Sequence, residues 1–187
     1  MKYLLCVCAL FSVITTATAN QLNKQVMQSM YKFGVPVVGY AIINKGTIAQ
    51  VNTLSIDKNI RVSNDTLFQA ASISKPFTAV ATLMLVDKKK IQLDGLANDY
   101  LSTWKIPQNK YNEKKPVLIE ELMDMTSGLS ISGFPGYSRD KPLPTPIQLL
   151  NGTYPANTPA IYVSHMPGTK YFYSGGGFQV LQQVISD

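Results

Sequence analysis

Cysteine and histidine are nearly absent from this sequence. Its 187 residues include two cysteines, Cys6 and Cys8, and one histidine, His165. Both cysteines lie in an N-terminal segment that we expect to be cleaved, so the mature chain has no thiol for a disulfide, a nucleophile or a metal site. A zinc site around His165 would need a cluster of carboxylates, which the sequence does not show. We therefore expect neither a metal nor a cofactor.

Long hydrophobic runs are also scarce, and the clearest one lies at the N-terminus. Lys2 gives a positive start, residues 4–14 are mostly apolar, and Ala17-Thr18-Ala19 supplies small residues for a cleavage site. This pattern is typical of a secretory signal peptide and is too short for a membrane anchor. We predict that residues 1–19 are removed and that the mature protein is periplasmic or secreted, with no integral membrane segment.

The excess of positive charge is modest. The formal net charge is +6, and removal of Lys2 with the signal peptide lowers it by one. We interpret the densest basic runs, Lys88-Lys89-Lys90 and Lys114-Lys115, as solvated helix ends and expect no nucleic-acid partner, because an exported protein rarely meets nucleic acid. With 45% hydrophobic and 15% charged residues, the composition is typical of one modest globular domain or two small lobes.

The most informative stretch runs from residue 66 to residue 86. Pro76 suits the first turn of a helix, where a missing N–H is tolerated. From residue 77 to residue 86 only two threonines are polar. A helix that is apolar nearly all round is expected to be buried on every side.

Ser72 and Lys75 stand at the start of this helix, one helical turn apart, so their side chains can touch. A lysine withdrawn from water gives up its proton more readily, and a helix N-terminus stabilises negative charge. The pair therefore has the properties of an activated serine nucleophile, although Ser72 as a helix cap remains the alternative. The same spacing recurs at Ser29/Lys32, Ser55/Lys58, Ser102/Lys105 and Ser138/Lys141. Those four pairs lack an apolar helix directly after them.

The remaining pattern predicts a mixed α/β (α+β) protein. Residues 20–65 are expected to form a helix over 21–33 and strands over 35–44 and 47–54, joined by a turn at Asn44-Lys45-Gly46, and to allow a short strand over 60–62. Residues 66–187 are expected to form a mostly helical subdomain. Its further helices are predicted within 98–104, over 116–125 with Glu120 and Glu121 facing outward, over 146–151, and from Phe178 onward, where a glycine run packs closely before the helix.

Three segments together resemble the serine β-lactamase and penicillin-binding protein superfamily. They are T-L-F-Q-A-A-S-I-S-K-P-F-T-A, L-M-D-M-T-S-G-L and P-G-T-K-Y-F-Y-S-G-G-G-F-Q-V-L-Q-Q-V, in that order. The sequence looks most similar to the class C branch, which includes DD-peptidases and esterases. The resemblance implies an antiparallel sheet flanked by helices plus a helical subdomain. It also implies that Ser72 is the acylated nucleophile and that Lys75 and Tyr173 transfer its proton.

The sequence departs from the family pattern at three points. Gly175 occupies the substrate-binding position where the family has an asparagine amide, and Met125, which we interpret as a packing residue, replaces a frequent histidine. The third motif, Lys-Thr-Gly or His-x-Gly, has no counterpart. Because family members are about twice as long, we expect this chain to be the N-terminal half of a longer protein, truncated before the C-terminal strands and inactive alone.

The resemblance implies a serine hydrolase that acts on an ester, peptide or lactam carbonyl, including a peptidoglycan-derived one. Loss of the amide at position 175 weakens the case for a dedicated β-lactamase. A Ser-His-Asp triad on His165 is a rival, but the sequence has no Gly-x-Ser-x-Gly elbow. The other alternative is a non-catalytic relative that binds peptidoglycan fragments or a partner, or an inactive fragment.

Overall fold

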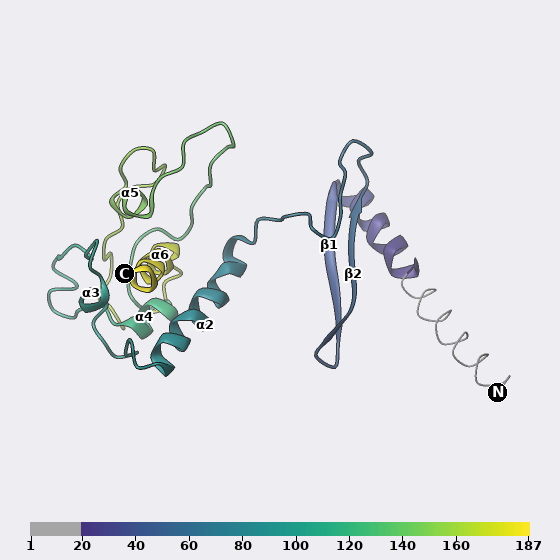
Figure 1. Ribbon diagram of the computed structural model, residues 1–187. Helices are drawn as coiled ribbons and strands as arrows, with labels where there is room; N and C mark the ends of the chain where they lie inside the picture. Colours follow the sequence, from purple (N-terminus) through teal and green to yellow (C-terminus); the bar gives the residue numbers. More distant parts are fainter. Residues whose placement is uncertain (1–19) are drawn as a thin grey trace. The chain divides into compact units, whose positions relative to one another are not determined.

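The computed structural model describes residues 20–187, which fall into two compact units with a boundary between Gln69 and Ala70 (Figure 1). The predicted signal peptide, residues 1–19, lies outside the described residues. None of the helices within residues 20–187 is long and apolar enough to cross a bilayer. The same residues bring together no group of three side chains suited to bind a metal ion.

The first unit is a helix followed by an antiparallel hairpin, as the sequence predicts. The helix covers residues 20–33, and strands β1 (Val37–Asn44) and β2 (Thr47–Ser55) pair from Val37↔Ser55 to Asn44↔Thr47. Lys45 and Gly46 both have positive φ angles, 48° and 76°, which suit the tight turn of a two-residue hairpin loop. Tyr40 Oη donates a hydrogen bond to Asn23 Oδ1 at 2.5 Å and thereby links the hairpin to the helix.

The short strand over residues 60–62 is not formed. The Ile60 N–H donates to the Asp57 carbonyl at 3.1 Å, so a turn uses the backbone group that a strand would offer to a neighbour. Further along, the Phe68 ring covers Gly39 of β1, where an added Cβ would lie 2.9 Å from the ring. The hairpin therefore gains side-chain cover from this connecting segment but no third strand.

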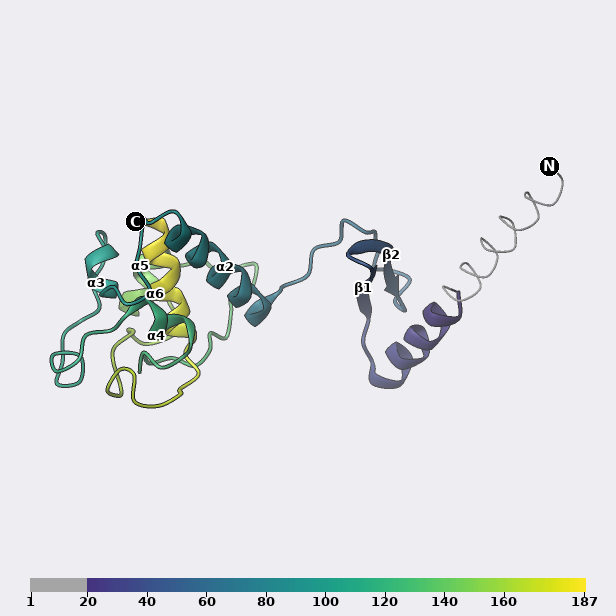
Figure 2. The same cartoon turned by 90° about the horizontal axis from the view of Figure 1, so that it is seen from below.

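The regular elements of the second unit are all helices, joined by long irregular segments, and this unit contains most of the core. Its elements are the 3-10 turn η1 (Ala71–Ile73) and helices α2 (Ser74–Asp87), α3 (Ala97–Tyr100), α4 (Ile119–Met123), α5 (Pro146–Asn151) and α6 (Gly175–Ser186). Helix α6 contacts α2, α4 and α5 (Figure 2). The fully buried side chains of the core include Val180 and Leu181 of α6 itself, together with Leu101, Ile119, Leu122, Leu129, Leu150, Ile161 and Val163.

Within the second unit, helix α2 is buried on one side only, whereas the sequence predicts that it is buried all round. Thr82 is its one buried residue, and Leu85 and Val86 are half-buried against the core. On the other side, Phe77 and Val80 are 73% and 56% exposed. In the second unit, α6 packs against the buried side of α2. The apolar residues on the opposite side of α2 have no comparable contact with another helix of this unit.

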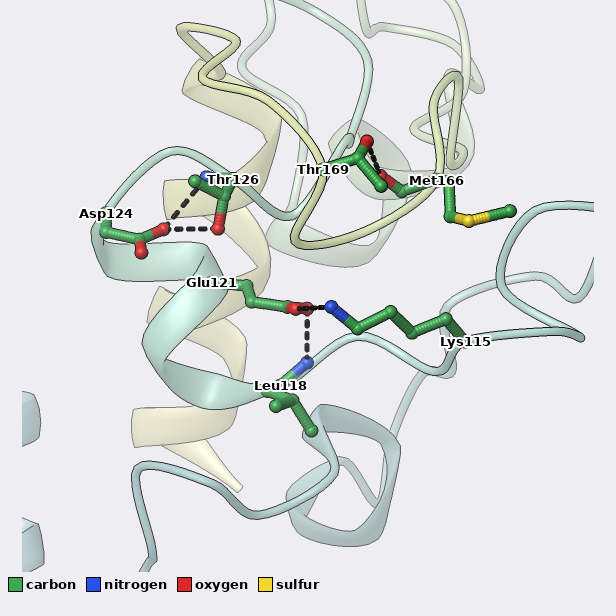
Figure 3. A network of polar contacts seen from close by, with 7 residues as sticks. All are labelled: Lys115, Leu118, Glu121, Asp124, Thr126, Met166 and Thr169. Carbon is green, nitrogen blue, oxygen red and sulfur yellow. Dashed lines mark hydrogen bonds and ion pairs between the residues drawn. The ribbon is translucent and has the colours of Figure 1, made fainter.

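Helix α4 is shorter than predicted because a buried carboxylate closes its N-terminus. The Glu121 side chain, only 5% exposed, accepts from the Leu118 N–H at 3.0 Å and pairs with Lys115 Nζ at 2.9 Å (Figure 3). Glu121 therefore faces inward rather than outward, and Lys115 is a salt-bridge partner rather than a solvated helix end. Gly168, with a φ of +68°, lies so close to this ion pair that an added Cβ would collide with both side chains.

Helix α6 begins at Gly175, three residues before the predicted start, and the glycine run packs closely as expected. Ser174 caps the helix by accepting from the Gly177 N–H at 2.8 Å and donating to the Ser130 carbonyl at 3.1 Å. An added Cβ on Gly176 would collide with the same Ser130 carbonyl. At the far end, the Asp187 carboxylate accepts from the Ser102 N–H at 2.7 Å. Helix α6 is therefore fastened at both ends.

Protonation of Asp187 is expected to weaken this fastening at low pH. Partial burial raises the pKa of the Asp187 carboxyl, but hydrogen bonds from Thr103, Ser102 and Gln183 outweigh that effect and lower the pKa from 3.8 to about 2. A carboxyl whose pKa is lower in the folded state stabilises the fold above about pH 4, and this contribution is lost as the pH falls towards 2. Asp187→Asn should therefore lower the Tm at neutral pH and reduce the further fall of the Tm in acid.

Thermal unfolding of the two proteins across this pH range measures the effect. Asp140→Asn is a matched control, because the Asp140 side chain is 71% exposed and pairs with Lys141 only at 3.5 Å. The control should unfold like the unchanged protein at every pH. If the Tm of Asp187→Asn falls as far between neutral and acid pH as that of the unchanged protein, the Asp187 carboxylate does not fasten α6.

Candidate active site

Ser72 lies in the η1 turn, which leads directly into α2. Ala71, the residue before it, has a φ of +46°, a left-handed conformation that is uncommon for a residue other than glycine. The turn leaves the Ser72 side chain exposed at the start of α2. Pro76 lies in the first turn of the helix, as the sequence predicts. The candidate nucleophile is therefore accessible and precedes a helix N-terminus.

Lys75 extends from the first turn of α2 back toward Ser72. Its Nζ donates a hydrogen bond to Ser72 Oγ at 3.2 Å. The same nitrogen lies 5.0 Å from the centre of the Tyr173 ring and 5.7 Å from that of the Phe178 ring. Lys75 is half-buried rather than buried, because this end of α2 is open on one side. The ammonium is thus held by two aromatic faces and a hydroxyl, with partial access to water.

Tyr173 completes the cluster from a distant part of the chain. Its Oη lies 2.8 Å from Ser72 Oγ, and either oxygen can donate the hydrogen bond. Hydrogen bonding to Ser72, and then to Lys75, lowers the pKa of the Tyr173 phenol, while partial burial opposes the shift and the Lys75 charge adds to it. A lowered pKa means that the phenol loses its proton at lower pH, and the resulting phenolate is the form that can act as a general base.

The three groups that the sequence predicts as catalytic therefore meet. Within residues 20–187, Ser72 and Lys75 are also the one Ser-x-x-Lys pair of the five whose side chains are hydrogen-bonded to each other. In three of the other pairs the partners are elsewhere. Ser55 Oγ donates to the Asp57 carbonyl, Lys105 Nζ donates to the Asn98 carbonyl, and Lys141 pairs with Asp140.

A model of the beta-lactamase family matches residues 20–187, nearly the whole chain. The chain belongs to the beta-lactamase family. It is 23% identical over 180 residues to Protein flp of Staphylococcus aureus strain N315, in a match that covers 93% of this chain and 34% of flp. The chain thus spans about a third of the length of the curated relatives that it matches.

Solved structures share the fold. The octameric penicillin-binding protein homologue from Pyrococcus abyssi matches with a TM-score of 0.67 and 22% identity, over 90% of this chain and 38% of its own. The beta-lactamase/D-alanine carboxypeptidase from Yersinia pestis, solved with citrate, matches with a TM-score of 0.62 and 23% identity, over 84% of this chain and 44% of its own. The fold is therefore the β-lactamase/transpeptidase-like fold. The class C assignment stays a prediction.

Gly175, where the resemblance expects an asparagine, is the first residue of α6. Its N–H donates to the Ser132 carbonyl at 3.2 Å. A Cβ at this position would lie 3.1 Å from that carbonyl oxygen and 3.2 Å from Cε2 of Phe134. A larger side chain would therefore be crowded unless the segment over Gly175 shifted. A role for Gly175 in substrate binding stays a prediction.

His165 is part of a structural hydrogen-bond network. Ser164 Oγ donates to the Gly128 carbonyl at 3.0 Å and lies 2.8 Å from His165 Nδ1. Because the single hydroxyl proton is used on the carbonyl, the hydroxyl accepts from the imidazole, so His165 is not its base. The His165 ring also packs against Phe172 at 5.0 Å between ring centres. The geometry favours a packing role over a Ser-His-Asp triad.

Sequence reasoning missed how Met125 positions Tyr173. Met125 has a φ of 67°, so its carbonyl turns toward the segment that carries the tyrosine. That carbonyl accepts from the Phe172 N–H at 2.8 Å, and Met125 Sδ accepts from the Ser174 N–H at 3.4 Å. Met125 therefore bonds both neighbours of Tyr173, a role beyond packing. No sequence signal marks it, because both bonds are to backbone groups about 50 residues away.

The sequence predicts Phe178 only as the start of a helix, whereas the structure places its ring beside Lys75. Replacing Phe178→Leu keeps an apolar side chain but removes one aromatic face from Lys75. An exposed cation–π contact contributes about 0.5–1 kcal/mol. We therefore expect a fluorophosphonate to label Ser72 of the full-length variant roughly two- to fivefold more slowly, whereas Phe178→Tyr should stay near the original rate. Equal rates for the leucine and tyrosine variants would show that the aromatic face does not hold Lys75.

Proposed function

We propose that the protein is a serine hydrolase that transfers an acyl group through an ester on Ser72. The observation that carries the proposal is the position of Ser72 Oγ, which is 2.8 Å from Tyr173 Oη and 3.2 Å from Lys75 Nζ. A serine hydroxyl becomes a useful nucleophile when a neighbouring base takes its proton as it attacks. Membership of the beta-lactamase family supports the same chemistry.

The geometry suggests how the proton moves. With Tyr173 as the phenolate, the Ser72 proton passes to Tyr173 Oη as Ser72 Oγ adds to the substrate carbonyl. The negative charge thereby moves to the carbonyl oxygen, and the Lys75 ammonium balances it throughout. The Ser72 backbone N–H is the donor that this turn offers to the carbonyl oxygen. When the tetrahedral intermediate collapses, the leaving oxygen or nitrogen takes the proton from Tyr173. Water then adds to the acyl carbon and gives a proton to Tyr173, and Ser72 Oγ takes that proton as its bond to the acyl group breaks, which releases the acid and restores Ser72.

The substrate is proposed as an ester, a peptide or a lactam, including fragments of peptidoglycan. The Yersinia pestis neighbour is described as a D-alanine carboxypeptidase as well as a β-lactamase, which supports peptide and lactam carbonyls as candidates. The predicted signal peptide supports action outside the cytoplasm, in the periplasm or after secretion. Gly175 offers no side-chain amide to hold a substrate carbonyl, so an ester that needs less orientation is the favoured class.

Labelling of the full-length protein tests this proposal. A fluorophosphonate loses fluoride to a reactive serine and leaves a stable adduct, which peptide mapping should find on Ser72. Ser72→Ala should lose both the adduct and the hydrolysis of a p-nitrophenyl ester. Ser74→Ala is the matched control, because Ser74 lies two residues along in the first turn of α2. It should retain most of both activities.

Two outcomes would contradict the proposal. Hydrolysis by Ser72→Ala at the original rate would remove Ser72 from the mechanism, and loss of the adduct in Ser74→Ala alone would move the nucleophile to Ser74. Absence of both labelling and hydrolysis in a folded full-length protein would favour a non-catalytic relative that binds its ligand without reacting.

A further inference from the structure

The segment over residues 130–134 is bonded across the start of α6. The Ser130 carbonyl accepts from Ser174 Oγ at 3.1 Å. The Ile131 and Ser132 carbonyls accept from the N–H groups of Gly176 and Gly175 at 2.9 and 3.2 Å. Three consecutive carbonyls are therefore used by the helix start. A side chain that follows them in sequence has a defined position over the first turn of α6.

Phe134 is that side chain. Its ring lies on Gly175, within 3.2 Å of the point where a Cβ would be, and its other contacts are with the apolar core. The residue is half-buried, so part of the ring stays accessible. The ring occupies the space toward which a side chain at position 175 would extend. The Phe134 ring therefore fits in this position because residue 175 is a glycine.

Phe178 links this face of α6 to the candidate active site. Residues three apart in a helix share a face, so Phe178 lies on the same face one turn further along. The Phe178 ring is 5.7 Å from Lys75 Nζ, and Lys75 is bonded to Ser72. Phe134, which lies on Gly175, and Phe178 therefore follow each other along one face of α6, and Phe178 lies beside Lys75.

We propose that Phe134, together with Phe178, forms an aromatic wall beside Ser72 that selects acyl donors with an aromatic or aliphatic acyl group. Phe134 is the specificity-determining residue of the two, because Phe178 already contacts Lys75. The inference rests on the proposed acyl transfer and names its substrate class. Apolar pockets discriminate substrates strongly by their fit, with one methylene group changing kcat/KM by about tenfold or more.

The test compares kcat/KM for two p-nitrophenyl esters that share a leaving group, the 3-phenylpropionate and the acetate. For the full-length protein we expect the ratio of the first to the second to be about tenfold or more. Phe134→Ala should bring this ratio close to one, and Phe134→Tyr, which keeps the ring, should preserve it. Leu143→Ala is a control in the same loop region, since Leu143 is 72% exposed. It should keep the original ratio.

The controls separate failure of this inference from failure of the proposed function. Fluorophosphonate labelling of Ser72 in each variant reports the reactive centre independently of the acyl group. If Phe134→Ala is labelled and hydrolyses the acetate, yet keeps the original ratio, the aromatic wall does not exist and the proposed hydrolase stands. If the unchanged protein is neither labelled nor active, the hydrolase proposal fails and this inference fails with it.

Folding of the Phe134→Ala variant is monitored by its thermal transition. Phe134→Leu provides a second measurement, because leucine keeps much of the apolar volume on Gly175 but lacks the ring. Its ratio of 3-phenylpropionate to hexanoate hydrolysis should fall relative to the unchanged protein. An unchanged ratio in Phe134→Leu would contradict an aromatic wall even if the alanine variant is unstable.

Discussion

The candidate site depends on one hydrogen bond between residues that are far apart in sequence. Ser72 Oγ and Tyr173 Oη lie 2.8 Å apart across a separation of 101 residues. The bond forms only if the turn before α2 and the segment before α6 are placed to within a fraction of an ångström. The contact between α2 and α6 places the two helices, and local bonds then place the two side chains.

Several further hydrogen bonds of the second unit hold α6 and the segment before it in place. Ser174 and the glycines hold its N-terminus against residues 130–132, and Asp187 holds its C-terminal end to residues 102–103. Met125 bonds the backbone on both sides of Tyr173. Side chains fixed in this way lose little conformational entropy when a substrate binds, which is the advantage of preorganisation in catalysis.

Local features were predictable from the sequence, and features that depend on distant partners were not. The Asn44-Lys45-Gly46 turn, the helix over 146–151 and the Ser72–Lys75 spacing depend on residues close in sequence, and all three appear as predicted. The exposure of α2, the inward position of Glu121 and the position of Phe134 on Gly175 depend on which distant segments pack nearby. The resemblance identified Tyr173, which spacing alone could not bring to Ser72.

The central claim is that Ser72, Lys75 and Tyr173 act as one unit, and a double-mutant cycle tests it most directly. The rate of fluorophosphonate labelling at Ser72 is measured in the full-length protein, in Lys75→Ala, in Tyr173→Phe and in the double variant. The account predicts that each single change slows labelling by orders of magnitude and that the double variant is hardly slower than the worse single one. Losses that multiply would show that Lys75 and Tyr173 act independently and would contradict the account.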